Sequence, residues 1–396
     1  MWNSGWQIKS LSEITEIIGG GTPKTNNSAY WNGDIVWLSP TDLPKIGDIV
    51  NVSDSKHKIT KLGLEKSSAQ LLPKGSIVFS SRASIGKIGI ADIELCTNQG
   101  FANFICNANV YNKFLAYALK KYTPEITALS NSTTFAEVSK SSLKSFSIPV
   151  PSRQEQRRIV AKLDSLFARI DRAVALVEQN IANAQHLMAS VLNGVFESLM
   201  GQNGIKPVQE LSHNIQYGFT GKTSEQGSFK YLRITDIQNS KVDWSSTPFA
   251  VIAEHEARKY LLQKGDIVFA RTGATTGKSY LFVDKVPSIF ASYLIRVVVK
   301  QDLILPEFLY LFFQSPNYWK QVMGKVVGAA QPNVNGQKLA EVSLPVPTIT
   351  KQTETIHYLA FVQERQRFVV ELQQKRLLEL TALKSSLLDT AFKGEI

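Results

Sequence analysis

Cysteine and histidine are both scarce in this sequence. The 396 residues include two cysteines, Cys96 and Cys106, and five scattered histidines, with no CxxC pair and no metal-ligand spacing. Disulfide frameworks and structural zinc sites need several such residues at defined spacings. We therefore expect two reduced thiols inside a core and no bound metal, as is typical of a cytoplasmic protein.

Long hydrophobic runs are also missing. The segment FLYLFF, residues 308–313, is among the longest unbroken apolar stretches, whereas a membrane-spanning helix needs about 20 such residues. The first residues, MWNSGWQIKS, show no apolar run after a charge and do not resemble a secretory signal. We expect a cytoplasmic protein with no membrane partner.

Familiar catalytic signatures are absent as well. The sequence has no HExxH, no GxSxG, no glycine fingerprint for a dinucleotide, and no Asn/Asp-Pro-Pro-Tyr/Phe tetrapeptide of the kind that amino-methyltransferases use. We therefore assign no catalytic residue. What the chain does contain is positive charge, since 44 Lys and Arg against 33 Asp and Glu give a net charge of +11. Such an excess favours a polyanionic partner.

The chain contains an internal duplication. LLPKGSIVF (71–79) returns as LLQKGDIVF (261–269) with seven identities in nine positions, and SIPVP (147–151) returns as SLPVP (343–347). The offsets of 190 and 196 residues are too long for a solenoid repeat. We predict a duplicated two-part unit.

In each copy the residue pattern changes at the Pro-x-Pro segment. Residues 1–151 and 201–347 hold short β-branched runs broken by Gly, Asn, Asp and Pro, which predict a mixed α+β domain. Residues 152–200 and 348–396 contain no proline and predict one long helix each. Helices of this length rarely stand alone, so we expect them to pack on each other.

Apolar residues at steps of three and four mark the expected contact face of each helix. In the first helix they are Ile159, Leu163, Leu166, Ile170, Ala173, Val177, Ile181, Ala184, Met188, Val191 and Val195. In the second helix they form a looser stripe of Leu359, Val362, Val369, Leu372, Leu380, Leu383 and Leu387.

The excess charge lies in the α+β blocks. Residues 1–151 hold 15 Lys and Arg against 11 Asp and Glu, and residues 201–347 hold 16 against 11. The helices are nearly neutral, with six against five in 152–200 and seven against six in 348–396. A neutral helix pair suits a spacer, and two basic domains suit two contacts with a polyanion.

The stretch RTGATTGKS, residues 271–279, is close to a nucleotide-binding P-loop. A P-loop places four residues between Gly and Gly-Lys-Ser/Thr, but Gly273 and Gly277 enclose only three. The duplicate, SSRASIGKIG (80–89), keeps the Gly-Lys pair and loses the first glycine and the Ser/Thr. We therefore do not expect an ATP site here.

Both copies instead share a strand that runs into a turn with an arginine, small hydroxyl residues and Gly-Lys. Such a turn can place cations and backbone N–H groups against a DNA phosphate, with an arginine free for a guanine edge. A solvated β-turn is the alternative. The candidate residues are Arg82, Ser84 and Lys87 in one copy and Arg271, Thr272 and Lys278 in the other.

Further loops match between the copies. IIGGGTPKTN (17–26) aligns with IQYGFTGKTS (215–224), which predicts a groove-facing loop or a plain hairpin. The loop candidates are Thr22, Lys24, Tyr217, Thr220 and Lys222, together with Gln331, Asn333 and Asn335, whose amides can pair with adenine. Thr41-Asp42 and Thr235-Asp236, in WLSPTDL and YLRITDI, favour capping of a turn over a base contact.

This arrangement resembles the specificity subunit of Type I restriction-modification systems over the whole chain. The segments that carry the resemblance are GGGTPKTNNSAYWNGDIVWLSPTDL (19–43), KGSIVFSSRASIGKIGI (74–90), SIPVPSRQEQRRIV (147–160), KGDIVFARTGATTGK (264–278) and SLPVPTITKQTETI (343–356). PVPSRQEQRRIV is similar to the PLPPLxEQxxIV segment that opens the family's helices. The second copy departs from it, because Lys351 replaces the glutamate before Gln352.

The resemblance implies two target recognition domains, each reading one half of a split double-stranded DNA sequence. It implies that the two helices pack as an antiparallel coiled coil with pseudo-twofold symmetry, and a helix of this length would span roughly 70 Å. Two modification subunits carrying S-adenosylmethionine would methylate adenine, and restriction subunits would bring ATP and Mg. This prokaryotic chain itself would be non-catalytic and bind no cofactor.

Two other functions stay open on the residues alone. One is a nucleotide-dependent enzyme that uses residues 271–279, for which ATP binding lost on Lys278→Ala would be the sign. The other is a coiled-coil scaffold that ignores DNA.

Overall fold

The computed structural model describes residues 5–44, 47–130, 136–238, 241–271, 277–323 and 334–396. The chain divides into two compact units. Unit 1 consists of Met1–Val177 and Lys375–Ile396, and unit 2 consists of Glu178–Gln374. Each unit therefore combines one α+β block with part of each long helix. Among the described residues, no helix is both long and apolar enough to cross a bilayer.

The α+β block of unit 1 is built on two sheets. Its elements are β1 (Gln7–Ser10), α1 (Leu11–Ile14), β2 (Thr15–Gly19), β3 (Trp31–Leu38), β4 (Ile49–Val52), β5 (His57–Ile59), α2 (Lys61–Glu65), β6 (Ile77–Ser80), β7 (Ile88–Ala91), β8 (Cys96–Thr97), β9 (Phe101–Cys106), α3 (Asn112–Lys121), α4 (Thr123–Ala128), α5 (Lys140–Ser145) and β10 (Ser147–Val150). One sheet has the order β2-β9-β6-β7-β4 and the other β5-β3-β8, while β1 pairs with β10.

The α+β block of unit 2 has a closely similar plan. Its elements are β11 (Ile205–Pro207), β12 (Ser212–Tyr217), β13 (Thr223–Ser224), β14 (Lys230–Leu232), β15 (Ile237–Gln238), β16 (Lys241–Val242), β17 (Phe249–Ala250), α7 (Glu254–Ala257), β18 (Ile267–Ala270), β19 (Ser279–Leu281), β20 (Ser288–Phe290), β21 (Leu294–Val299), α8 (Pro306–Phe313), α9 (Pro316–Met323), α10 (Gly336–Ala340) and β22 (Ser343–Pro345). The sheets are β12-β21-β18-β19 and β13-β17-β14-β20, with β11 paired to β22 and β15 to β16.

The two blocks share most of their strand pairings, as the duplicated sequence predicts, although β4 of unit 1 and β13 of unit 2 have no counterpart in the matching sheet. In each main sheet, the strand with the sequence IVF (β6 or β18) lies between its two antiparallel neighbours and is buried along its whole length. The parallel pair β3–β8 of unit 1 corresponds to β14–β20 of unit 2, with Trp37 opposite Cys96 and Tyr231 opposite Ile289. The predicted α+β fold with two duplicated domains is confirmed.

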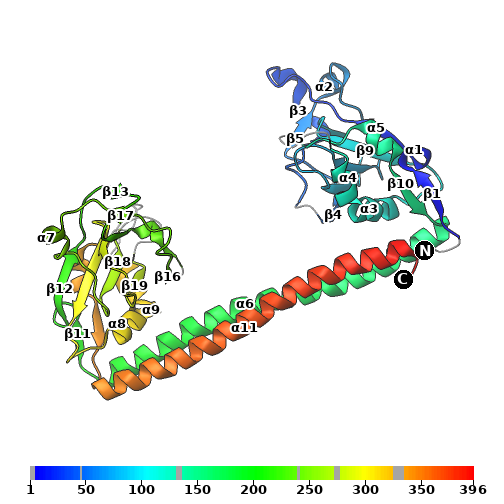
Figure 1. The fold of residues 1–396 in the computed structure, drawn as a ribbon. Coiled ribbons are helices and arrows are strands. Elements are labelled where there is room, and N and C mark those ends of the chain that lie inside the picture. The colour runs from blue at the N-terminus through cyan, green and yellow to red at the C-terminus, as the bar shows by residue number, and fades with distance from the viewer. Residues whose placement is uncertain (1–4, 45–46, 131–135, 239–240, 272–276, 324–333) are drawn as a thin grey trace. The chain divides into compact units, whose positions relative to one another are not determined.

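The two long helices are α6 (Arg153–Gln202) and α11 (Ile349–Lys393) (Figure 1). Apolar side chains of both helices belong to the core of each unit. In unit 1 the beginning of α6 packs on the end of α11, where Ile159 and Leu163 share a core with Phe392. In unit 2 the end of α6 packs on the beginning of α11, where Phe196 shares a core with Leu359. Within each unit the two segments are therefore antiparallel, and burial of apolar side chains holds them together.

The contact face predicted for α6 is confirmed, because its members from Ile159 to Val195 are all buried or half-buried. The face predicted for α11 is wrong at three positions: Val369, Leu372 and Leu383 are exposed. The physical reason is that α11 has two apolar faces, of which one packs on α6 and the other is open to solvent. Hydrophobic periodicity alone does not show which of two faces is buried.

Both cysteines are free, as expected. Burial raises the pKa of the Cys96 thiol to about 11 and that of Cys106 to about 12. Thiols with such high pKa values are poor nucleophiles near neutral pH, which fits a packing role.

A fully buried glutamine fixes the start of α6 to the α+β block of unit 1. Gln156 accepts a hydrogen bond at Oε1 from the Tyr111 N–H (2.7 Å). Its Nε2 donates to the carbonyl oxygens of Asn109 (3.1 Å) and Pro151 (2.9 Å). One amide side chain thus joins the first turn of the long helix to the loop before α3 and to the Pro-x-Pro segment.

Gln352 does the same for α11 in unit 2. It is fully buried, accepts from the Leu305 N–H (2.8 Å), and donates to the carbonyl oxygens of Leu303 and Pro347, both at 2.9 Å. The Lys351 departure leaves this contact intact. It changes only a surface ion pair, since Lys351 meets Glu354 across one helical turn.

We predict that Gln156→Ala lowers the free energy of unfolding of unit 1 by about 2 to 4 kcal/mol, because it removes three hydrogen bonds to the backbone, of which the one to Pro151 is buried. Urea unfolding of the full chain, with hydrogen exchange at Tyr111, measures the change. Gln154→Ala, at an exposed position two residues away, is the matched control. Equal stability of the two variants would contradict the anchoring role.

Candidate nucleic-acid interface

The loop that follows β2 in unit 1 is held by two hydrogen bonds at Gly21 and by a close backbone approach at Gly20. The Gly21 N–H donates to the Thr97 carbonyl (2.8 Å), and Trp37 Nε1 donates to the Gly21 carbonyl (2.8 Å). At Gly20 an added Cβ would lie 2.0 Å from the Asn98 carbonyl oxygen, so only glycine fits. The loop is pressed against the end of the parallel strand β8.

The loop that follows β12 in unit 2 is held in the same way at the corresponding positions. The Phe219 N–H donates to the Phe290 carbonyl (2.8 Å), and the Tyr231 hydroxyl donates to the Phe219 carbonyl (2.7 Å). A Cβ at Gly218 would lie 2.3 Å from the Ala291 carbonyl oxygen. The two copies thus position this loop by equivalent contacts, although some of its residues differ, such as Gly21 and Phe219.

The predicted residues of these loops lie at the surface to different degrees. In unit 1, Thr22 is half-buried and its hydroxyl donates to the Gln99 side chain, whereas Lys24 is exposed. In unit 2, Thr220 and Lys222 are both exposed and line an open pocket of ≈ 780 Å³. The structure brings Thr220 and Lys222 together in that pocket, and their contact with DNA stays a prediction.

The Gly-Lys turns close β-hairpins in both copies. Gly86 (φ 98°) and Gly277 (φ 83°) are left-handed, and their N–H groups donate back to the Ser80 and Ala270 carbonyls, respectively. The chain then continues directly into β7 or β19. A P-loop leads into a helix whose N-terminus faces the phosphates, and here Ser279 begins a strand instead. The geometry of this segment does not favour nucleotide binding.

Lys87 and Lys278 stand at equivalent positions but have different surroundings. Lys87 Nζ donates to the Pro40 carbonyl (2.7 Å) and the Leu43 carbonyl (3.1 Å), which ties the turn to the segment after β3. Lys278 is exposed. The ammonium group of Lys87 therefore stabilises its own domain, while that of Lys278 points to solvent and suits a phosphate contact.

Arg82 and Ser84 belong to the first of these turns. Arg82 is exposed and its Nε lies 3.6 Å from Glu137 Oε2, a weak surface pair. Ser84 is half-buried, and its carbonyl accepts the Ser80 hydroxyl. Arg82 remains available to an anion, whereas Ser84 contributes mainly to the turn.

Arg271 directly follows β18 in unit 2, and its guanidinium stacks over the Tyr217 ring. Its guanidinium carbon is 5.1 Å from the centre of the Tyr217 ring, and the Tyr217 hydroxyl accepts from the Gly336 N–H (2.8 Å). The Arg271 N–H donates to the Tyr293 carbonyl (3.1 Å), just as the Ser81 N–H donates to the carbonyl of Gly100. Arg271 therefore corresponds in space to Ser81, one residue before Arg82.

Tyr293 was missed by the sequence reasoning. Its side chain is 62% exposed and lines the same pocket as Lys222. An aromatic residue next to a strand is usually predicted to lie in the core. No pattern in the sequence indicated that Tyr293 is exposed. An exposed tyrosine beside cations is typical of nucleic-acid contacts.

Of the remaining candidates, only Asn335 lies within the described residues. It caps the N-terminus of α10, because its Oδ1 accepts from the Lys338 N–H (2.8 Å). That contact gives Asn335 a structural role as a helix cap, and its contact with adenine stays a prediction. Thr272, Gln331 and Asn333 lie outside the described residues.

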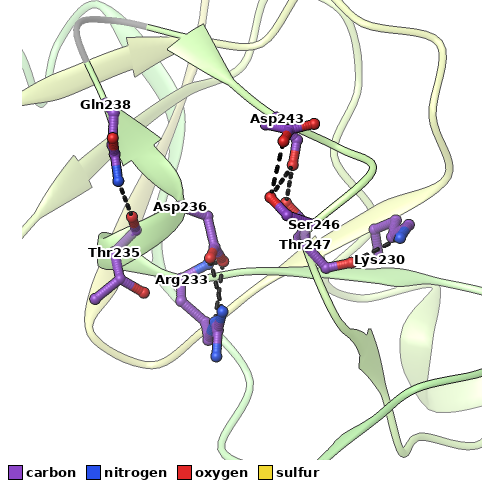
Figure 2. A network of polar contacts seen from close by, with 8 residues as sticks. All are labelled: Lys230, Arg233, Thr235, Asp236, Gln238, Asp243, Ser246 and Thr247. Carbon is purple, nitrogen blue, oxygen red and sulfur yellow. Dashed lines mark hydrogen bonds and ion pairs between the residues drawn. The ribbon is translucent and has the colours of Figure 1, made fainter. Parts of the chain in front are cut away.

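The two Thr-Asp pairs cap turns, as predicted. Asp42 Oδ2 accepts from the Ser39 N–H, and Asp236 Oδ2 accepts from the Arg233 N–H, both at 2.8 Å. In unit 2 the same carboxylate also binds the Arg233 guanidinium (Figure 2). Its hydrogen bonds raise the pKa of Arg233 further above neutrality. Arg233 lines the pocket with Lys222 and was not foreseen from the sequence.

The contrast between the two lysines gives a paired prediction. Lys87→Met removes two charge-assisted hydrogen bonds and should lower the free energy of unfolding by about 1 to 3 kcal/mol, whereas Lys278→Met should change it by less than about 0.5 kcal/mol. Thermal and urea unfolding of the full chain measure both. Equal destabilisation by the two variants would contradict the assignment.

A family model described as Type I restriction modification DNA specificity domain matches residues 3–178 and 192–380. The chain is 26% identical over 415 residues to the Type I restriction enzyme MjaIX specificity subunit of Methanocaldococcus jannaschii, covering 99% of this chain and 93% of that protein. It is 24% identical over 422 residues to the EcoKI specificity subunit of Escherichia coli, covering 99% of this chain and 89% of that protein.

Solved structures share the fold at low identity. A chain from a study of complex assembly and conformational transition of the type I R-M system has a TM-score of 0.78 at 19% identity, with full coverage of both chains. The HsdS subunit from Thermoanaerobacter tengcongensis has a TM-score of 0.59 at 18% identity and covers 100% of this chain and 98% of its own.

Proposed function

The chain belongs to the family of Type I restriction-modification DNA specificity subunits, and on that premise we propose that its two α+β blocks read the two halves of a split double-stranded DNA target. The chain is the DNA-recognition subunit and catalyses no reaction itself. It would act in the cytoplasm of a prokaryote, with S-adenosylmethionine on modification subunits and ATP with Mg on restriction subunits.

One observation carries this proposal. Both blocks pin the same loop by equivalent hydrogen bonds, Gly21 to Thr97 and Phe219 to Phe290. The loop keeps a threonine and a lysine in both copies and varies beside them, with Gly19 and Pro23 in one copy and Tyr217 and Gly221 in the other. A fixed scaffold with variable loop residues is the arrangement expected for base recognition, because backbone geometry sets the distance to the groove and side chains set the sequence. Divergence between the copies predicts two different half-sites.

The balance of charge supports the same reading. Both blocks are net positive, with 15 basic against 11 acidic residues in 1–151 and 16 against 11 in 201–347. Cations such as Lys24, Lys222 and Lys278 are exposed there. Exposed cations provide the sequence-independent attraction to phosphates on which specific contacts are built.

Exchange of one block tests the assignment of half-sites. If residues 1–151 are replaced by the equivalent block of a relative with a different target, one half of the methylated motif should change and the other half and the spacing should stay. Single-molecule sequencing of methylated adenines in the host measures this. An unchanged motif would instead support a scaffold that ignores DNA.

A second surface suits the modification subunits. On the open face of α11 in unit 2, Tyr358, Phe361, Phe368 and Leu372 are 52%, 56%, 61% and 50% exposed. Together with Arg365, whose guanidinium lies 5.2 Å from the Phe361 ring centre, they follow the alternating spacing of three and four of a coiled-coil seam. Exposed apolar stripes of this kind mark protein contacts. We assign this stripe to a helix of a modification subunit.

The double variant Phe361→Ser with Phe368→Ser should weaken co-purification of the chain with its modification subunit at least tenfold, because two aromatic anchors are lost. Leu378→Ser, at an exposed leucine away from the stripe, is the control and should bind normally. Helix content by circular dichroism should be equal in both variants. Full retention of the partner by the double variant would exclude this surface.

A further inference from the structure

Arg233 occupies a distinct place in unit 2. It directly follows β14, at the end of the strand whose Tyr231 hydroxyl anchors the 219–223 loop. Its side chain lines the open pocket together with Lys222 and Tyr293. The arginine therefore stands among the exposed cation and tyrosine that the loops present, on the same surface of one unit.

Asp236 holds this arginine in one orientation (Figure 2). Nε of Arg233 lies 3.0 Å from Oδ2 of Asp236, and Nη2 lies 2.7 Å from Oδ1. The backbone N–H of Arg233 also donates to Oδ2 at 2.8 Å, so the carboxylate is itself fixed by the turn that it caps. The Asp236 side chain is 9% exposed and that of Arg233 is 41% exposed. The carboxylate of the pair is thus buried and fixed, whereas the guanidinium is partly exposed to solvent.

The side-on pairing leaves a specific set of donors free. A guanidinium has five N–H groups, and the aspartate takes one from Nε and one from Nη2. Among the described contacts, the Nη1 hydrogens and the second Nη2 hydrogen have no partner. These donors point along the outer edge in the parallel arrangement that matches O6 and N7 of guanine in the major groove.

A base edge fits this group better than a phosphate. The neighbouring carboxylate cancels most of the positive charge of the arginine, which weakens its attraction to a phosphate but not its directional hydrogen bonds to a neutral base. Fixing the side chain before binding also reduces the entropy lost on contact. Lys222 in the same pocket and Lys278 elsewhere on the unit are exposed cations that suit phosphate contacts.

Unit 1 has the same turn without the arginine. Ser39 stands at the corresponding position, and its N–H and hydroxyl both donate to Asp42 Oδ2, at 2.8 and 2.7 Å. The carboxylate is therefore retained as a turn cap in both copies, and the guanidinium is an addition that only unit 2 carries.

We propose that Arg233, oriented by Asp236, is a specificity-determining residue that reads one guanine in the half-site recognised by unit 2. This rests on the proposed function. Unit 1 has no equivalent, so the contact contributes to the difference between the two half-sites.

The test uses the full chain assembled with its modification subunits and duplexes in which each base pair of the methylated motif is replaced in turn. For the wild type, replacing one G·C pair of the unit 2 half-site should weaken binding by about 10-fold to 100-fold. In Arg233→Ala this preference should fall to within about twofold, while preferences in the other half-site stay. Ser39→Ala, the matched change in unit 1, should alter no guanine preference.

Arg233→Lys separates the base contact from a phosphate contact. Lysine keeps the charge and lacks the fork, so the guanine preference should remain lost in this variant, and its thermal midpoint shows that the turn is folded. Recovery of wild-type behaviour by lysine, uniform weakening on all duplexes, or an unchanged preference in Arg233→Ala would each overturn the proposal. If the wild-type complex instead binds every duplex equally, the proposed function itself fails.

Discussion

A buried glutamine amide at the first turn of each long helix is the constraint on which the rest of the structure depends. Gln156 and Gln352 each make three hydrogen bonds to backbone groups of the preceding block. Because an unpaired buried amide is costly, the helix leaves its block in one direction. A helix can act as a spacer only if its end is fixed in this way. Both copies have the glutamine, although the preceding residue is Glu155 in one and Lys351 in the other.

The loops after β2 and β12 share their backbone contacts, whereas some of the side chains that make or surround these contacts differ between the two units. Trp37 and Tyr231 are different residues, yet each donates to the carbonyl of the loop beside it. The same turn carboxylate serves Ser39 in one unit and Arg233 in the other. Divergence on a fixed frame explains how two copies of one fold present different side chains without a change in the backbone contacts.

Much of this could be predicted from the sequence, because it depends on local patterns. The repeat of LLPKGSIVF located two equivalent buried strands, and the apolar stripe of α6, which shifts after Val177, located its packing face. The capping role of Asp42 and Asp236 followed from residue type alone. The short spacing around Gly277 argued against a P-loop, and Ser279 begins a strand instead of the helix that follows a P-loop.

What could not be predicted depends on contacts between distant segments. The packing face of α11 was misassigned at Leu372, because this helix has two apolar faces and only its neighbours decide between them. Lys87 and Lys278 both follow a glycine at aligned positions, yet Lys87 reaches the carbonyls of Pro40 and Leu43 while Lys278 is exposed. Tyr293 and Arg233 became candidate contact residues because they line the same pocket. They are far apart in the sequence, so no sequence motif indicated this proximity.

The central claim is that this chain selects where adenines are methylated. Mapping of methylated adenines across the genome of the host, with the gene intact and deleted, tests it most directly. The account predicts that one asymmetric split motif disappears on deletion and returns on complementation. Survival of every motif in the deleted strain would contradict it.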